Sequence, residues 1–182
     1  MAKLMGSLAV IVLAASLIGQ EAKKAAAPAK HSSGAVLHPE MTVASDAGTY
    51  DKPAGTMGDK PSDPWSATTI GAAVDKKTQP GKVVTVTGEV IDLSCYLQVG
   101  KHGEKHKSCG EKCLNSGQPI GLLTKAGAVY LLMDEEHDPR RDGQTTLRKA
   151  ALDNFAKIME VTGTETSFGG YKAIYVQGYV KK

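Results

Sequence analysis

One short segment of the 182-residue chain gathers most of its soft metal ligands. It holds all three cysteines and two of the five histidines, namely Cys95, His102, His106, Cys109 and Cys113. Thiolate and imidazole groups are typical zinc ligands, and thiolate-rich sites also suit cuprous copper. The segment therefore predicts a metal or thiol site.

The spacing within this segment fits one face of a helix. If residues 102–114 are helical, His106, Cys109 and Cys113 lie at positions i, i+3 and i+7. At about 100° per residue, their side chains fall within about 60° of arc. Cys95 follows an expected strand and would reach this face from the barrel, which completes a tetrahedral Cys3His set. The predicted metal ligands are Cys95, His106, Cys109 and Cys113, with His102 or His137 as further candidates.

Two other interpretations of the cysteines stay open. A disulfide from Cys95 to Cys109 or Cys113 would stabilise the fold by about 3 kcal/mol in the chain-entropy model. It leaves one thiol unpaired, whereas a metal site accounts for all three. The second alternative is a reactive redox thiol or a cofactor ligand. The surrounding lysines, Lys101, Lys105, Lys107 and Lys112, are expected to offset thiolate charge and lower the thiol pKa values. Covalent c-type haem is not expected, because the C-x-x-C-H motif is absent.

The elements around the cysteines are mostly strands. In the strand expected at residues 82–92, Val84, Val86 and Val90 alternate to one face. A helix is expected at 145–156, where Leu147, Ala151 and Phe155 share a face. Further strands are expected at 120–125, 128–134, 157–164 and 171–180, and a short helix at 66–74.

This order of elements predicts a mostly-β fold. It runs strand, cysteine-rich helical insertion, strand, strand, helix, strand, strand, which is the order of a five-stranded OB-like barrel. A small α+β sheet of the same elements is the alternative.

A sequence pattern in this region resembles a known family. It reads G-E-V-x-D-x-x-C-Y, then H-x-x-C-x-x-x-C, then G-x-P-I-G-L-L, from Gly88 to Leu123. The pattern resembles exported bacterial OB-fold-like proteins that are largely uncharacterised. The resemblance spans residues 82–182 and implies an exported single-barrel protein whose cysteines matter.

The N-terminal third of the chain differs in composition from the rest. Residues 1–20 carry a lysine at position 3 and continue with about 15 apolar positions, which is typical of a secretory signal peptide. We expect an exported protein of the periplasm or cell envelope, anchored in the membrane only if this segment stays uncleaved. Residues 21–66 are rich in Ala, Pro and Gly, and predict a flexible, disordered tether. The OB-like domain is expected at residues 67–182, with the Cys/His insertion at 93–119.

Composition and motifs exclude several functions. A net charge of +3 and an aromatic content of 5% argue against nucleic-acid binding. The motifs G-x-S-x-G and H-E-x-x-H and a phosphate loop are absent, so an enzyme is disfavoured. The acidic segment 134–142, which contains His137, is expected to be a solvated loop.

Our functional hypothesis is an exported module that binds zinc or copper. It would serve as an accessory subunit or partner-binding protein of the cell envelope. The alternatives are a non-catalytic interaction module with a structural disulfide, and a thiol-redox protein.

Overall fold

The computed structural model describes residues 46–135 and 145–177. Their strands are β1 (Gly55–Met57), β2 (Lys82–Asp92), β3 (Ile120–Thr124), β4 (Val129–Asp134), β5 (Ile158–Phe168) and β6 (Tyr171–Val176). Their helices are α1 (Ala67–Ala72), α2 (Leu93–Val99), α3 (Lys107–Asn115) and α4 (Thr146–Asp153). Two short 3₁₀ turns are η1 (Val74–Lys76) and η2 (Glu104–His106).

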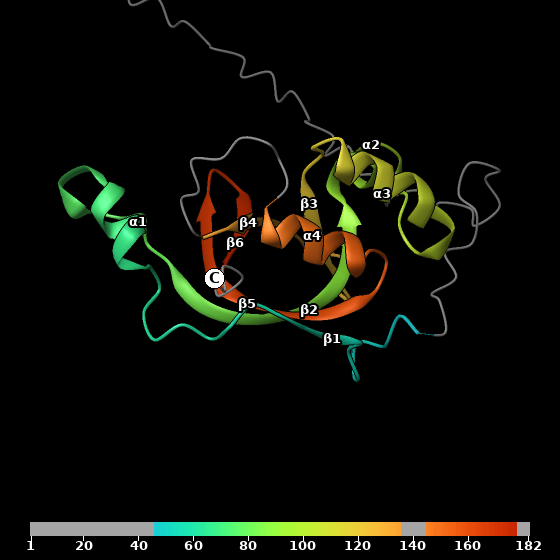
Figure 1. Cartoon of the computed structure of the whole chain (residues 1–182), viewed down its shortest axis with the longest axis horizontal. Coiled ribbons are helices and arrows are strands. Elements are labelled where there is room, and N and C mark those ends of the chain that lie inside the picture. Colours follow the sequence, from blue (N-terminus) through green and yellow to red (C-terminus); the bar gives the residue numbers. More distant parts are fainter. Residues whose placement is uncertain (1–45, 136–144, 178–182) are drawn as a thin grey trace, which may run out of the picture. The chain divides into compact units, whose positions relative to one another are not determined.

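Strands β2 to β6 close into a barrel (Figure 1). The strand order is β5-β2-β3-β4-β6, and pairing between β5 and β6 completes the ring. All contacts in this ring are antiparallel except the parallel pair β4–β6. The predicted five-stranded OB-like barrel is thus confirmed, with α2, η2 and α3 inserted between its first two strands and α4 between its third and fourth.

The long strand β2 bends so that it can pair with two neighbours. Gly88 faces Met159 on β5 and Thr124 on β3. A side chain at this glycine would begin only 2.7 Å from Cγ of Leu122, so its absence lets β3 approach closely. Val90 on the same strand is fully buried in the core.

Helix α4 covers the hydrophobic core with the face predicted from the sequence. Leu147 and Ala151 are buried, and so is Phe155 just beyond the end of the helix. The Thr145 hydroxyl caps the helix by accepting a hydrogen bond from the backbone N–H of Arg148 at 3.2 Å. The cap and the apolar face together explain why this segment is helical.

The folded domain begins earlier than predicted. The tether was expected to reach residue 66, but β1 pairs in parallel with Met159–Val161 of β5. Met57 is 1% exposed and belongs to the core. The predicted boundary is therefore wrong for residues 46–66, whereas the predicted signal peptide and residues 21–45 lie outside the described residues. No helix within the described ranges is long and apolar enough to cross a membrane.

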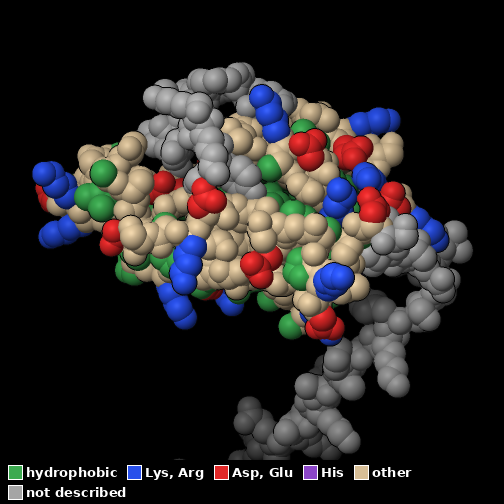
Figure 2. Space-filling view, turned by 60° about the horizontal axis from the view of Figure 1, so that its bottom comes forward, with side chains coloured by type: hydrophobic (Ala, Val, Ile, Leu, Met, Phe, Trp, Pro, Cys, Tyr) green, Lys and Arg blue, Asp and Glu red, His purple; other side chains and the backbone are tan. Residues whose placement is uncertain are grey.

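The start of the acidic loop is buried rather than solvated. Glu135 is 5% exposed. Its carboxylate accepts hydrogen bonds from the backbone N–H of Ser66 at 2.9 Å and the hydroxyl of Thr69 at 2.7 Å. Glu135 thus holds α1 against the barrel, and residues 136–142 with His137 lie outside the described residues. Acidic and basic side chains are interspersed over the face shown in Figure 2.

Candidate metal site at the end of strand β2

Asp92 ends β2 and begins α2. Its Oδ1 atom accepts hydrogen bonds from the backbone N–H groups of Ser94 at 3.0 Å and Cys95 at 3.4 Å. Aspartate is among the preferred N-cap residues, because it satisfies backbone donors that have no partner inside the helix. The cap fixes Cys95 in the first turn of α2 and leaves the second carboxylate oxygen, Oδ2, free to face the site.

Helix α3 presents the second half of the site and is held from two sides. Gly110 packs directly on the ring of Phe155, where an added Cβ would lie 2.0 Å from the ring carbon Cζ. The Arg148 guanidinium donates through Nη1 to the backbone oxygens of Leu114 at 2.7 Å and Gln118 at 2.8 Å. These contacts satisfy carbonyl groups at and beyond the C-terminal end of α3 and fix its position.

Three ligand atoms from different elements converge between these helices. An Asp92 carboxylate oxygen, the Cys95 thiol and a His106 ring nitrogen all lie within 4.8 Å of one another. Asp92 is 0% exposed and His106 is 4% exposed. This buried group, which we call the Asp-Cys-His group, can hold a metal ion.

Two atoms of the Asp-Cys-His group lack hydrogen-bond partners. Oδ2 of Asp92 and Nε2 of His106 are buried, make no hydrogen bond, and lie 4.0 Å apart. An unsatisfied buried polar atom costs about 1–3 kcal/mol, and more when it is charged. A cation between the two atoms would satisfy both.

The protonation states of the site suit metal binding. Burial lowers the pKa of His106, although the Asp92 carboxylate opposes this shift, so the neutral imidazole is favoured. Neutral imidazole is the form that ligates metals.

Both thiols beside Asp92 hold their protons more tightly than an ordinary cysteine. The Asp92 carboxylate, followed by burial, raises the pKa of Cys113 from 9.0 to about 12. Burial, followed by Asp92, raises the pKa of Cys95. The expected lowering of thiol pKa values by lysines is therefore wrong for these two cysteines. A bound cation would displace the thiol protons.

The predicted cysteine ligands have different positions. Cys113 is near enough to Asp92 and Cys95 for each of them to affect its pKa, but its thiol is not among the ligand atoms that lie within 4.8 Å of one another. Cys109 is exposed, whereas Gly110 and Leu114 are the buried residues of α3. At about 100° per residue, Cys109 points about 100° or more away from these buried positions, and Cys113 lies closer to them. Cys109 therefore lies at the solvent edge of the predicted face.

His102 lies outside the Asp-Cys-His group and contacts Glu89 instead. Its Nδ1 atom lies 2.8 Å from Oε2 of Glu89, a residue that is 4% exposed. Oε1 of Glu89 accepts from the backbone N–H of Gly103 at 2.6 Å. Gly103 has a φ of 77°, which interrupts the helix predicted for residues 102–114. The structure therefore places His102 outside the Asp-Cys-His group, and helix α3 begins only at Lys107.

Sequence reasoning missed Asp92 as a ligand. Its signal was present, because an aspartate at the end of a strand and three residues before a cysteine can cap a helix that carries this cysteine. All three cysteines are free thiols in this structure. Comparison of the chain with protein-family models, curated proteins and solved structures finds no match.

Proposed function

We propose that this protein is an exported OB-fold module that binds one zinc ion. The ligands are Asp92, Cys95 and His106, and Cys113 is the fourth. The metal ties α2 and α3 to the end of β2. The observation that carries the proposal is the buried pair of Asp92 Oδ2 and His106 Nε2, which face each other at 4.0 Å without a hydrogen bond.

The donor set favours zinc over cuprous copper. Copper(I) prefers soft sulfur ligands, whereas zinc accepts carboxylate, imidazole and thiolate together. With metal–ligand bonds of about 2.0–2.3 Å, the ligand atoms of a tetrahedral zinc site lie about 3.3–3.8 Å apart. The three atoms of the Asp-Cys-His group lie within 4.8 Å of one another, so a contraction of about 1 Å is sufficient.

A four-ligand set supports a structural role. Structural zinc sites use four protein ligands, and catalytic sites keep one position for water or substrate. With Cys113 as the fourth ligand, no position is open. The protein then acts as a non-enzymatic accessory or partner-binding module, and its place in the cell envelope rests on the apolar segment at residues 1–20.

Metal analysis of matched cysteine variants tests the zinc site. The purified full chain should contain about one equivalent of zinc by mass spectrometry. Cys95→Ser and His106→Ala should lose it, because each removes a ligand of the Asp-Cys-His group. Cys109→Ser is the control and should keep it, because Cys109 is exposed whereas Cys95 and Cys113 are half-buried.

The same samples distinguish the zinc site from its main alternative, a structural disulfide. Cys95 and Cys113 are neighbours, so a disulfide between them is the second candidate. A metal-free protein in which these two cysteines are quantitatively oxidised would refute the zinc proposal. Loss of zinc in Cys109→Ser and not in Cys113→Ser would refute the assigned ligand set.

Export needs a separate test. Fractionation of bacteria that express the full chain, followed by N-terminal sequencing, should find a shortened protein outside the cytoplasm. Full-length protein confined to the cytoplasm would contradict export and leave the zinc site untouched.

A further inference from the structure

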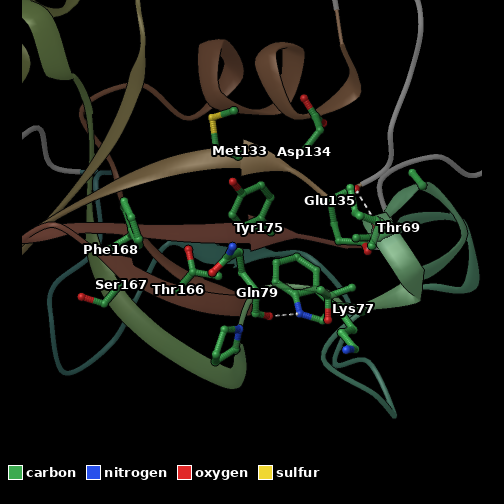
Figure 3. A pocket seen from close by; sticks show the side chains of 16 residues that line it. Thr69, Lys77, Gln79, Met133, Asp134, Glu135, Thr166, Ser167, Phe168 and Tyr175 are labelled. Atoms are coloured by element: carbon green, nitrogen blue, oxygen red, sulfur yellow. Dashed lines mark hydrogen bonds between the residues drawn. The ribbon is translucent and has the colours of Figure 1, made fainter.

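A cavity of about 810 Å³ opens beside α1. Helix α1 lies at the opposite end of the barrel from α2 and α3, so this cavity is separate from the metal site (Figure 1). One wall comes from α1 and η1, and another from the ends of β4 and β5. Tyr175 lies between these walls (Figure 3), and Trp65 also lines the cavity. Its volume falls within the range of about 300–1,000 Å³ that is usual for small-molecule sites.

Two aromatic rings form a corner in the cavity. The rings of Trp65 and Tyr175 meet edge to face, with centroids 5.3 Å apart and planes at 68°. The indole N–H of Trp65 donates to the backbone oxygen of Gln79 at 2.8 Å, which fixes the ring. Phe168, which is 81% exposed, also lines the cavity. The fixed Trp65 ring and the Tyr175 ring beside it offer π-electron density to a bound cation.

The charged groups of the lining are predominantly acidic. Asp134 and Glu135 line the cavity together with one lysine, Lys77. Glu135 accepts only from the neutral groups of Ser66 and Thr69 in the described part of the chain. The carboxylate of Asp134 makes no hydrogen bond or ion pair with another described residue. Two carboxylates against one ammonium group leave the lining negative.

We propose that this cavity binds a small organic ammonium ion. The aromatic corner and the carboxylates both attract positive charge. Apolar side chains such as Met133, Val74 and Pro80 favour a cation that carries alkyl groups over a hydrated metal ion. A quaternary or alkylated ammonium group satisfies both requirements.

Choline is a suitable probe. Trp65 is the only tryptophan of the chain, so a change in tryptophan fluorescence on titration reports binding at the cavity. The reference ligand is the uncharged analogue of choline in which carbon replaces the quaternary nitrogen. We expect the analogue to bind about tenfold more weakly, because it has the same shape without the charge. Calorimetry of the same titration provides a second signal.

Matched variants locate the effect. Asp134→Asn and Tyr175→Leu should each weaken choline binding severalfold, while Asp51→Asn, at an exposed carboxylate elsewhere, should not. Cys95→Ser should bind choline normally, because the metal site is separate. Equal binding of choline and the analogue, unchanged binding by Asp134→Asn, or no signal by either method would overturn the proposal.

Discussion

The two carboxylate oxygens of Asp92 have different surroundings. Oδ1 caps α2, and Oδ2 faces His106 in a buried position without a hydrogen bond. Capping favours a short polar residue at this position, whereas metal binding requires a negative charge. Substitutions can therefore separate the two tasks.

We predict opposite consequences for two substitutions of Asp92. Asp92→Asn keeps the cap, so the metal-free variant should be at least as stable as the metal-free wild type. Asp92→Ala should lower the free energy of unfolding by about 1 kcal/mol through loss of the cap. Both variants should lose most of their zinc affinity. Urea unfolding with and without chelator measures both effects, and a metal-free Asp92→Asn as unstable as Asp92→Ala would contradict the assignment.

The protonation of Cys113 gives a pH-dependent prediction for the metal-free protein. With a pKa of about 12, Cys113 is almost entirely a neutral thiol at pH 8 and should react slowly with iodoacetamide. Asp92→Asn removes the main cause of the raised pKa, so alkylation of Cys113 should accelerate. Since the folded-state pKa is raised, this thiol's contribution to stability is complete below about pH 9 and is lost as pH rises towards 12.

Peptide mass spectrometry resolves the three cysteines in this experiment. Cys109→Ser serves as the background in which Cys113 is followed without the exposed thiol. Rapid alkylation of Cys113 in the metal-free wild type at pH 8 would be inconsistent with the close approach of Asp92.

Residue types alone indicate part of the site. Cys95, His106 and Cys113 were predicted because soft ligands cluster there. The structure brings Cys95 and His106 within 4.8 Å of Asp92, and Asp92 raises the pKa of Cys113. The exposure of Cys109 was not predicted. Residue spacing gives the relative angles of side chains around a helix, but not which of these angles faces the barrel. Leu114, the buried apolar residue of α3, carries this information.

At the scale of elements, the position of α3 depends on the absence of a side chain at Gly110. Gly110 has no side chain where the ring of Phe155 approaches. Glycine is a poor helix former, but in this fold it permits the close contact that brings α3 to the core. Gly103 has the opposite effect, because its positive φ interrupts the helix that was predicted to begin at residue 102.

Two glycine substitutions should therefore change the free energy of unfolding in opposite directions. Gly110→Ala adds a methyl group against Phe155 and should lower the free energy of unfolding by about 1–3 kcal/mol. It should also weaken zinc binding, because α3 moves away from β2. Gly71→Ala in α1 meets no atom within 4 Å and should stabilise by up to about 1 kcal/mol. Equal effects in urea unfolding would contradict the packing of α3 on Phe155.

At the scale of the whole molecule, the barrel follows from local patterns and the additions to it do not. The alternation of apolar residues in β2 predicted that strand, and the order of the expected strands and helices predicted the barrel. Strand β1 has only three residues and no such alternation. Its partner β5 lies about 100 residues later in the chain, so this pairing could not be predicted from the local sequence. The cavity beside α1 also depends on distant contacts, such as that between Trp65 and Tyr175.

X-ray absorption at the zinc edge of the purified, zinc-loaded protein tests the central claim most directly. We predict two sulfur ligands at about 2.3 Å and two nitrogen or oxygen ligands at about 2.0–2.1 Å, supplied by Cys95, Cys113, His106 and Asp92. The spectrum of Cys109→Ser should be unchanged. Three sulfur ligands, or a protein that binds no zinc, would contradict the site.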